Sequence, residues 1–378
     1  MADAAGQPEI LGVLKSFLID KALPLWAGAG WDSSRGGFVE RLGHDGTPDT
    51  DAPRRLRVQS RQIYCFAKAA QFKWLPEARE IAFKGLDYML STMRSPDGKP
   101  GFVRLVGADR SVADPLRDTY DHAFVLLALA NLYQLGKDAQ VRAEIDQTLI
   151  FLDSQLRSEH GGFIEGLPAS LPRRQNPQMH LFEAMIALFD ATGEPVFQTR
   201  AGDFFSLFGM LFDSQTQVLG EYYEDDWSPI NPVVVEPGHL AEWVWLLKGF
   251  ERITGCPTGR QRTALMQSLP RFRDADGLLV DEADAAGNIV KSTRRCWPQT
   301  ELAKAWIAQT EGGEPGAKDE ALAALARLEA NYLRHPVAGG WYEQLDASGK
   351  PTSDTIAATT FYHVMCAISE AEQVLPQS

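Results

Sequence analysis

The chain has 378 residues, of which 44% are hydrophobic and 23% are charged, and its formal net charge is -13. This acidic surplus repels nucleic acid and anionic lipid at long range, so neither is an expected partner. The longest apolar run, from Ala123 to Leu132, is shorter than the roughly 20 residues that a membrane-spanning helix needs. Residues 1–7 lack the basic region and apolar core of a signal peptide. We therefore expect a cytoplasmic protein.

The four cysteines give no sign of a metal centre or of a disulfide framework. Cys65, Cys256, Cys296 and Cys366 are scattered and form no close pair. This pattern predicts reduced thiols in apolar helical surroundings.

Two kinds of helical segment alternate along the chain. Segments 77–90 and 318–333 mix leucine and isoleucine with charged residues, which indicates amphipathic helices at the surface. Others are apolar on nearly every face and must be surrounded by protein. These buried segments cover residues 123–133, 181–189, 240–250 and 302–307. The alternation predicts an outer ring and an inner ring of helices.

Glycine followed by an aromatic or aliphatic residue recurs between the two kinds of helix, where a tight turn is needed. The six occurrences begin at Gly36, Gly101, Gly161, Gly220, Gly277 and Gly339. Runs 38–42 and 341–345 alternate in polarity and precede turn residues, which predicts small hairpins. Six helical hairpins that close on themselves give an all-α (α/α)6 barrel with short β-hairpins in the inter-helix loops. We expect one domain over residues 1–378.

Polar clusters open the inner helices at intervals of about 60 residues. The clusters are Arg61-Gln62, Tyr120-Asp121-His122, Gln178 with His180 and Glu183, His239 with Glu242, Trp297 with Gln299 and Glu301, and Tyr362-His363. Because the inner helices of such a barrel are parallel, all six clusters are expected around one end of a central cavity. The helix N-termini there favour an anionic intermediate or an electron-rich ligand.

Histidine is concentrated at these helix starts. His239 with Glu242, and His180 with Glu183, stand three residues apart on one helix face, so each carboxylate can orient the ring or face the same cavity. The same spacing occurs among metal ligands, but few other acids lie at this end, which favours a site without metal. For His122, taken alone, a core packing role is the preferred interpretation.

Three further residues are candidates for the pocket. Arg61 carries a fixed positive fork that suits a sugar oxygen or an enediolate, unless it is paired with a neighbouring carboxylate. Trp297 precedes Pro298 at a helix start and can stack on a sugar ring or simply pack. Glu301 can hold a polar network or act as a base.

Five motifs together resemble the N-acylglucosamine 2-epimerase superfamily, and the resemblance covers essentially the whole chain. The motifs lie at residues 59–64, 175–184, 236–243, 297–301 and 361–363. The resemblance implies an (α/α)6 barrel of a sugar epimerase or isomerase that works without metal or redox cofactor.

The resemblance also implies roles for single residues. His239 and His363 match the acid/base histidines, and Tyr120 and Glu301 are expected to bind substrate from their places in the polar clusters. Matches to pocket positions are Arg61, His180, Glu242 and Trp297. The pair His180 and Glu183 is closer to the mannose isomerase and cellobiose epimerase branches, and the single Trp297 favours a monosaccharide.

The expected function is an aldose–ketose isomerase of the mannose/fructose type, in which histidines move protons through an enediolate. Sugar 2-epimerisation is the alternative. A glycoside hydrolase using Asp121 and Glu301, or a non-catalytic sugar-binding protein, ranks below both. The expected partner is a small sugar, and the oligomeric state is open, with a homodimer as one option.

Arginines precede several of the cluster helices. They could receive a phosphate or carboxylate of the substrate, but the preferred interpretation is solvated rim charge paired with acids. These arginines are Arg54, Arg55, Arg57, Arg173, Arg174, Arg294 and Arg295.

Overall fold

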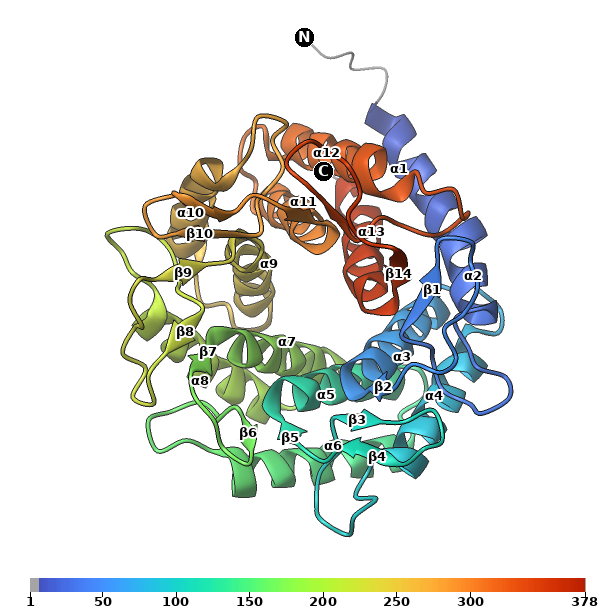
Figure 1. Ribbon diagram of the computed structural model, residues 1–378. Coiled ribbons are helices and arrows are strands. Elements are labelled where there is room, and N and C mark those ends of the chain that lie inside the picture. Colours follow the sequence, from blue (N-terminus) through green and yellow to red (C-terminus); the bar gives the residue numbers. More distant parts are fainter. Residues whose placement is uncertain (1–6, 378) are drawn as a thin grey trace.

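The computed structural model describes residues 7–377. The segment searched for a signal-peptide pattern therefore lies almost wholly outside the described residues. Six inner helices surround a central axis (Figure 1). They are α3 (Leu56–Gln71), α5 (Thr119–Gln134), α7 (Gln175–Thr192), α9 (Pro237–Thr254), α11 (Cys296–Glu311) and α13 (Phe361–Val374). On α5, every residue from Ala123 to Leu132 is buried, as its apolar sequence requires.

An outer ring of helices packs around the inner one (Figure 1). It consists of α1 (Gln7–Ser16) continuing through Phe17–Ala22 into α2 (Leu23–Gly28), then α4 (Ala78–Thr92), α6 (Ala139–Phe151), α8 (Pro195–Leu211), α10 (Gly259–Ser268) and α12 (Ala317–Leu328). Each outer helix leads through a loop to the next inner helix. The predicted (α/α)6 barrel is confirmed.

Short antiparallel strand pairs join neighbouring repeats at one end of the barrel. The pairs are β2 (Arg54–Arg55) with β3 (Leu105–Val106), β5 (Arg117–Asp118) with β6 (Gly166–Leu167), β7 (Arg173–Arg174) with β8 (Tyr222–Tyr223), β9 (Val234–Val235) with β10 (Glu282–Asp284), β12 (Arg294–Arg295) with β13 (Gln344–Leu345), and β14 (Thr355–Ala357) with β1 (Arg41–Gly43). The last pair closes the ring.

Local hairpins are a smaller part of this pattern than the sequence predicts. β4 (Val112–Asp114) pairs with β3, and β11 (Ile289–Lys291) pairs with β10. The runs expected to form hairpins make only single bridges across their own turns, Leu42 to Pro48 and Leu345 to Pro351. Their ladders pair with adjacent repeats instead, because the closed ring sets each loop beside the next one, where backbone groups find partners.

The fourth residue of several inner helices fixes the preceding glycine loop. Gln59, Gln178 and Gln299 each accept from one loop N–H and donate to the carbonyl of the same loop residue. His122 holds the equivalent place, and its Nε2 accepts from Phe102 N–H at 3.0 Å. Burial lowers the pKa of His122 to about 4, which keeps this nitrogen an acceptor. The packing role preferred for His122 is confirmed.

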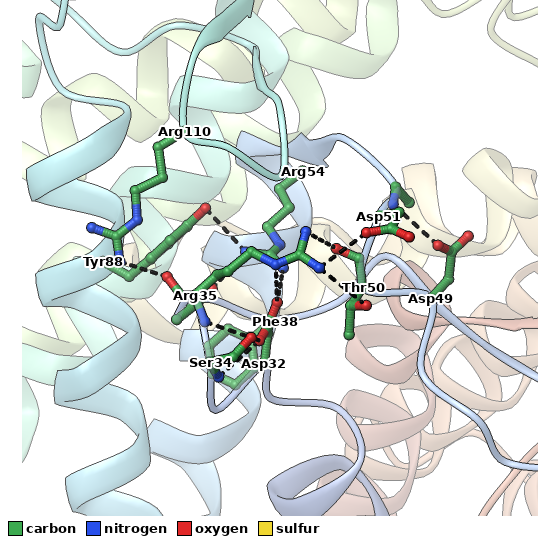
Figure 2. Close-up of polar contacts among 12 residues, drawn as sticks. Asp32, Ser34, Arg35, Phe38, Asp49, Thr50, Asp51, Arg54, Tyr88 and Arg110 are labelled. Atoms are coloured by element: carbon green, nitrogen blue, oxygen red, sulfur yellow. Dashed lines mark hydrogen bonds and ion pairs between the residues drawn. The ribbon is translucent and has the colours of Figure 1, made fainter.

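Buried arginines hold the loops through ion pairs with aspartates. The Arg54 guanidinium donates to Asp32 Oδ2 at 2.6 Å, and both side chains are almost fully buried (Figure 2). Arg117, Arg173 and Arg294 are equally buried and pair with aspartates of their own or a neighbouring loop. These arginines are structural.

Two further expectations concern the described part of the chain. Among residues 7–377, no helix combines the length and apolar character needed to cross a bilayer. Cys65, Cys296 and Cys366 are buried and Cys256 is half-buried, and all four are free thiols, as predicted.

Candidate active site

A cavity of about 620 Å³ opens where the inner helices begin. The sixth residue of each inner helix contributes to one ring of side chains there, if the last helix is counted from its leading turn Ala358–Thr360. These residues are Arg61, Phe124, His180, Glu242, Glu301 and His363. The Arg61 guanidinium lies 4.1 Å from the Phe124 ring centre, and the Phe124 and His180 ring centres are 4.5 Å apart. Equivalent helix positions thus converge, as the sequence predicts.

His363 is held as a neutral base. Its Nδ1 lies 2.7 Å from Glu301 Oε1, so Nδ1–H donates to the carboxylate and Nε2 keeps its lone pair. Burial lowers the pKa of His363 well below its ordinary value, and the cations Arg61 and Lys304 lower it further. At neutral pH this imidazole can therefore accept a proton.

His239 is held as a cation. Its Nδ1 donates to Glu221 Oε1 at 2.9 Å. Burial alone would lower the pKa of His239, but the charges of Glu221, Glu236 and Glu242 outweigh it and raise the pKa to about 9. The two histidines consequently differ in protonation at neutral pH, so one suits proton removal and the other proton donation.

Trp297 lies between the two histidines. Its ring centre is 4.9 Å from that of His239 and 5.5 Å from that of His363. The indole reaches this place because α9 has glycine at position 238, where a Cβ atom would come within 2.6 Å of the Trp297 ring. The indole offers an apolar face beside the reacting groups.

The Arg61 side chain is held in place by hydrogen bonds to uncharged groups. Its guanidinium donates to Tyr120 Oη at 2.8 Å and to Thr359 of the last repeat. No carboxylate lies within 4 Å of it among residues 7–377, so the ion pair considered as an alternative is not formed. A buried arginine without a carboxylate keeps its charge available for an anionic intermediate.

A layer of charged side chains underlies the cavity. The Lys304 side chain is fully buried, and its Nζ lies 2.6 Å from Glu301 Oε2 and 3.7 Å from the Trp245 ring centre. Burial and the neighbouring Glu301 raise the pKa of Glu242 well above its ordinary value, and neither Glu242 oxygen has a hydrogen-bond partner among the described residues. His180 Nδ1 donates to Glu183 Oε2 at 3.0 Å.

The structure gathers most of the predicted site residues. Those that line the cavity are Arg61, Tyr120, His180, His239, Glu242, Trp297 and His363. Glu301 lies behind His363 and positions it. Asp121 is buried 3.4 Å from Arg57 and, like Glu301, is not part of the lining, so the carboxylate pair considered for a hydrolase does not face the cavity.

Several charged residues of the site were not predicted from the sequence, among them Arg104, Asp118 and Glu165, which line the cavity. Glu221 and Glu343 stand in the glycine loops, which were interpreted as turns and small hairpins without a role in the site, and Glu236 precedes α9. Burial raises the pKa of Glu343 to about 7. Lys304 could have been found, because a lone lysine on an otherwise apolar helix three residues after Glu301 calls for a buried partner.

Three groups of side chains bring potential metal ligands within 4.8 Å of one another. They are His180, Glu183 and Glu242; Glu221, Glu236 and His239; and Glu242, Glu301 and His363. In the last group Glu301 already faces the Lys304 ammonium, and in the second Arg295 donates to Glu236 at 2.9 Å. Cations of the chain therefore already neutralise part of each of these two groups.

Comparison with known proteins places this barrel in a family. Residues 36–367 match the profile of the family described as N-acylglucosamine 2-epimerase (GlcNAc 2-epimerase). The chain belongs to this family, and it is an enzyme of the isomerase or epimerase kind.

Individual relatives extend over nearly the whole chain. It is 35% identical to a mannose-6-phosphate isomerase of Rhizobium meliloti, over 96% of this chain and 97% of the relative. It is 26% identical to a D-mannose isomerase of Marinomonas mediterranea, over 90% and 92%. The solved cellobiose 2-epimerase of Spirochaeta thermophila shares its fold, with a TM-score of 0.88 at 24% identity over 99% and 98% of the two chains.

Proposed function

We propose that this enzyme interconverts a mannose-type aldose and a fructose-type ketose. The observation that carries the proposal is the opposite protonation of two histidines on either side of one tryptophan. His363 is neutral beside Glu301, and His239 is cationic beside Glu221. Relatives named D-mannose isomerase and mannose-6-phosphate isomerase support the substrate class.

The proposed reaction begins with ring opening, in which the His239 imidazolium donates its Nε2 proton to the ring oxygen as the C1–O5 bond breaks. The anomeric hydroxyl loses its proton as the C1 carbonyl forms, and solvent returns that proton to His239. His363 Nε2 then removes the proton from C2, and the electron pair of that bond forms the C1–C2 double bond of an enediolate, with its negative charge on O1. Arg61 stabilises this charge, since it has no competing carboxylate. Transfer of a proton to C1, with the O2 proton moving to O1, gives the ketose.

Epimerisation differs only in the last transfer. If the proton returns to C2 from the opposite face, the product is the 2-epimer, and relatives named cellobiose 2-epimerase also match this chain. The relatives named mannose-6-phosphate isomerase and D-mannose isomerase align with more of this chain than the cellobiose 2-epimerase that is 25% identical to it. Their sequence identities are also higher. We therefore place isomerisation first.

We also propose that the reaction needs no metal or other cofactor and takes place in the cytoplasm. The positive charge that a metal would supply in the cavity is provided by Arg61, while Lys304 neutralises Glu301 beneath it. Activity is expected to survive dialysis against a chelator, measured as ketose formation before and after treatment. Loss of activity that added divalent metal restores would refute this point.

The test of the proposed function is proton NMR of the purified enzyme with mannose in deuterium oxide, with His239→Ala and His363→Ala alongside. We expect fructose with deuterium at C1, and a loss of about 10²–10⁴-fold in each variant. Glucose as the first product would establish epimerisation instead. Unchanged mannose would exclude it as a substrate, and full activity of either variant would exclude that histidine.

A further inference from the structure

The six repeats share one loop position that departs from its pattern in the second repeat. This position immediately precedes the first strand of each inter-helix loop. Its occupants are Glu40, Arg104, Glu165, Glu221, Asp281 and Glu343. Five are carboxylates and one is arginine.

The carboxylates at this position have structural or orienting partners. Glu40 binds the backbone and side chain of Arg55, and Glu165 binds Arg174 in the same way. Glu221 holds His239. Arg104 takes the same place in the fold, since its carbonyl accepts from the first N–H of α3 at 2.9 Å, as the Glu165 carbonyl does from α5 at 3.0 Å. The second repeat therefore has a positive charge where the others have a negative one, and Arg104 lines the cavity.

A second arginine, Arg57, lines the cavity on the same side as Arg104 and lies in the first turn of α3. Its acidic contact is Asp121, 3.4 Å away, and burial and Asp118 raise the pKa of Asp121 to about 7, so this carboxyl is only partly charged at neutral pH. Arg104 pairs with Asp114 of β4, and its side chain is 40% exposed. Each of the two arginines thus has an acidic partner, and a bound anion would share them with Asp121 and Asp114.

Arg57 and Arg104 come from different elements of the ring, because Arg104 precedes β3 in the loop that leads to α5, whereas Arg57 lies one turn before Arg61 on α3. Figure 1 places β3 and α5 across the central axis from α11, which carries Trp297, and α3 across from α9, which carries His239, while α3 also packs against α13, which carries His363. Tyr120 and Arg174 line the same side as the two arginines, and Arg174 lies 3.9 Å from Asp118. A sugar with C1 and C2 at the histidines would extend its other end towards this wall.

We propose that Arg57 and Arg104, flanked by Tyr120 and Arg174, bind the phosphate of a hexose 6-phosphate. The inference rests on the proposed function, which places C1 and C2 at the histidines. Guanidinium groups bind phosphate oxygens in pairs of parallel hydrogen bonds. The Tyr120 hydroxyl accepts from Arg61 and can still donate its own hydrogen. The relative from Rhizobium meliloti is named for a substrate of this chemistry.

The experiment compares kcat/KM for mannose 6-phosphate and for mannose in the wild type, Arg57→Gln, Arg104→Gln and the double variant. We expect the wild type to prefer the phosphate ester. The ratio of the two values should fall by about tenfold to a hundredfold in the double variant, as expected when one or two charge-assisted hydrogen bonds are lost. Arg104→Glu, which restores the carboxylate of the other repeats, should lower the ratio further.

Arg110→Gln is the matched control. Arg110 lies in the turn of the same β3–β4 hairpin, but its side chain donates to the Arg35 carbonyl beside Tyr88 and is not part of the cavity lining (Figure 2). It removes the same charge as Arg104→Gln, so long-range attraction changes similarly in both. An unchanged ratio in Arg110→Gln assigns the effect to direct contact, whereas an equal fall would overturn the subsite.

The other outcomes separate this proposal from the proposed function. Turnover of mannose with no preference for mannose 6-phosphate would overturn the subsite and leave the isomerase standing. If neither sugar is turned over, the proposed function fails. Calorimetric titration of the wild type and the double variant with mannose 6-phosphate then tests whether the phosphate subsite exists. Binding at least tenfold weaker in the double variant would support it, and absence of binding, or equal binding, would overturn it.

Discussion

At the scale of single residues, the site depends on two histidines that each donate to a carboxylate but have opposite pKa shifts. Glu221, Glu236 and Glu242 raise the pKa of His239 to about 9 against the effect of burial, whereas burial and the cations Arg61 and Lys304 keep the pKa of His363 low despite Glu301. The active form has His239 protonated and His363 neutral. The active form is therefore lost as pH rises through about 9, where His239 loses its proton, and as pH falls through the low pKa of His363, where that ring gains one. We expect kcat/KM to be independent of pH around neutrality.

Replacement of Glu221 by glutamine tests this account. The amide oxygen can still accept from His239 Nδ1, but the negative charge is gone, so burial lowers the pKa of the imidazole. We expect the alkaline limb of kcat/KM to move down by about one unit or more, the size expected for loss of an adjacent opposite charge. Glu40→Gln, at the equivalent position but paired with Arg55, should leave that limb in place. An unmoved limb in Glu221→Gln would assign the alkaline pKa to another group.

At the scale of elements, the close approach of α9 to α11 sets the position of Trp297. In Gly238→Ala the new methyl group would lie 2.6 Å from the indole and 2.9 Å from Pro298 Cβ, so the indole must move from between the histidines. We expect kcat/KM to fall by about tenfold to a hundredfold, as misplacement in an active site commonly causes, with a small change in melting temperature.

Gly249→Ala, on the same helix, is the control for that variant. Its methyl group would meet Ile186 atoms at 3.6 Å, an ordinary contact. Since alanine favours helix more than glycine, we expect unchanged kinetics and equal or greater thermal stability. Equal kinetic losses in both variants would show that α9 tolerates no added side chain and that Trp297 placement is not the cause.

The elements were predictable because their periodicity is a local property. Apolar runs such as 123–133 can only be inner helices, and His239 and Glu242 share a helix face by spacing alone. Glu221 and Lys304 were not predictable to the same degree, because their roles depend on partners that the closed ring brings together. The role of Arg104 was not predictable for a similar reason. Its positive charge is unusual only by comparison with the carboxylates that occupy the equivalent position in the other repeats, and the structure is needed to identify that position.

At the scale of the whole molecule, the site exists only if the ring is closed. His363 belongs to the last repeat, and Arg61 of the first repeat donates to Thr359 beside it. The junction is held by β1 with β14 and by three stacked rings, with the Trp26 ring centre 5.2 Å from Trp341 and 5.9 Å from Phe361. Every repeat of a closed ring has two neighbours, unlike the terminal repeats of an open array. We therefore propose that the chain unfolds as one unit.

Trp26→Ala tests the coupling of ring closure to function. Removal of this fully buried indole should lower the free energy of unfolding by about 3–5 kcal/mol, whereas Val13→Ala, at a 42% exposed position of α1, should change it by about 0.5 kcal/mol or less. In urea titrations followed by circular dichroism and by turnover, we expect both signals to be lost together in each variant, because opening the junction separates Arg61 from His363. If turnover disappears at lower urea than helicity, the junction opens before the barrel unfolds, and the chain is not one cooperative unit.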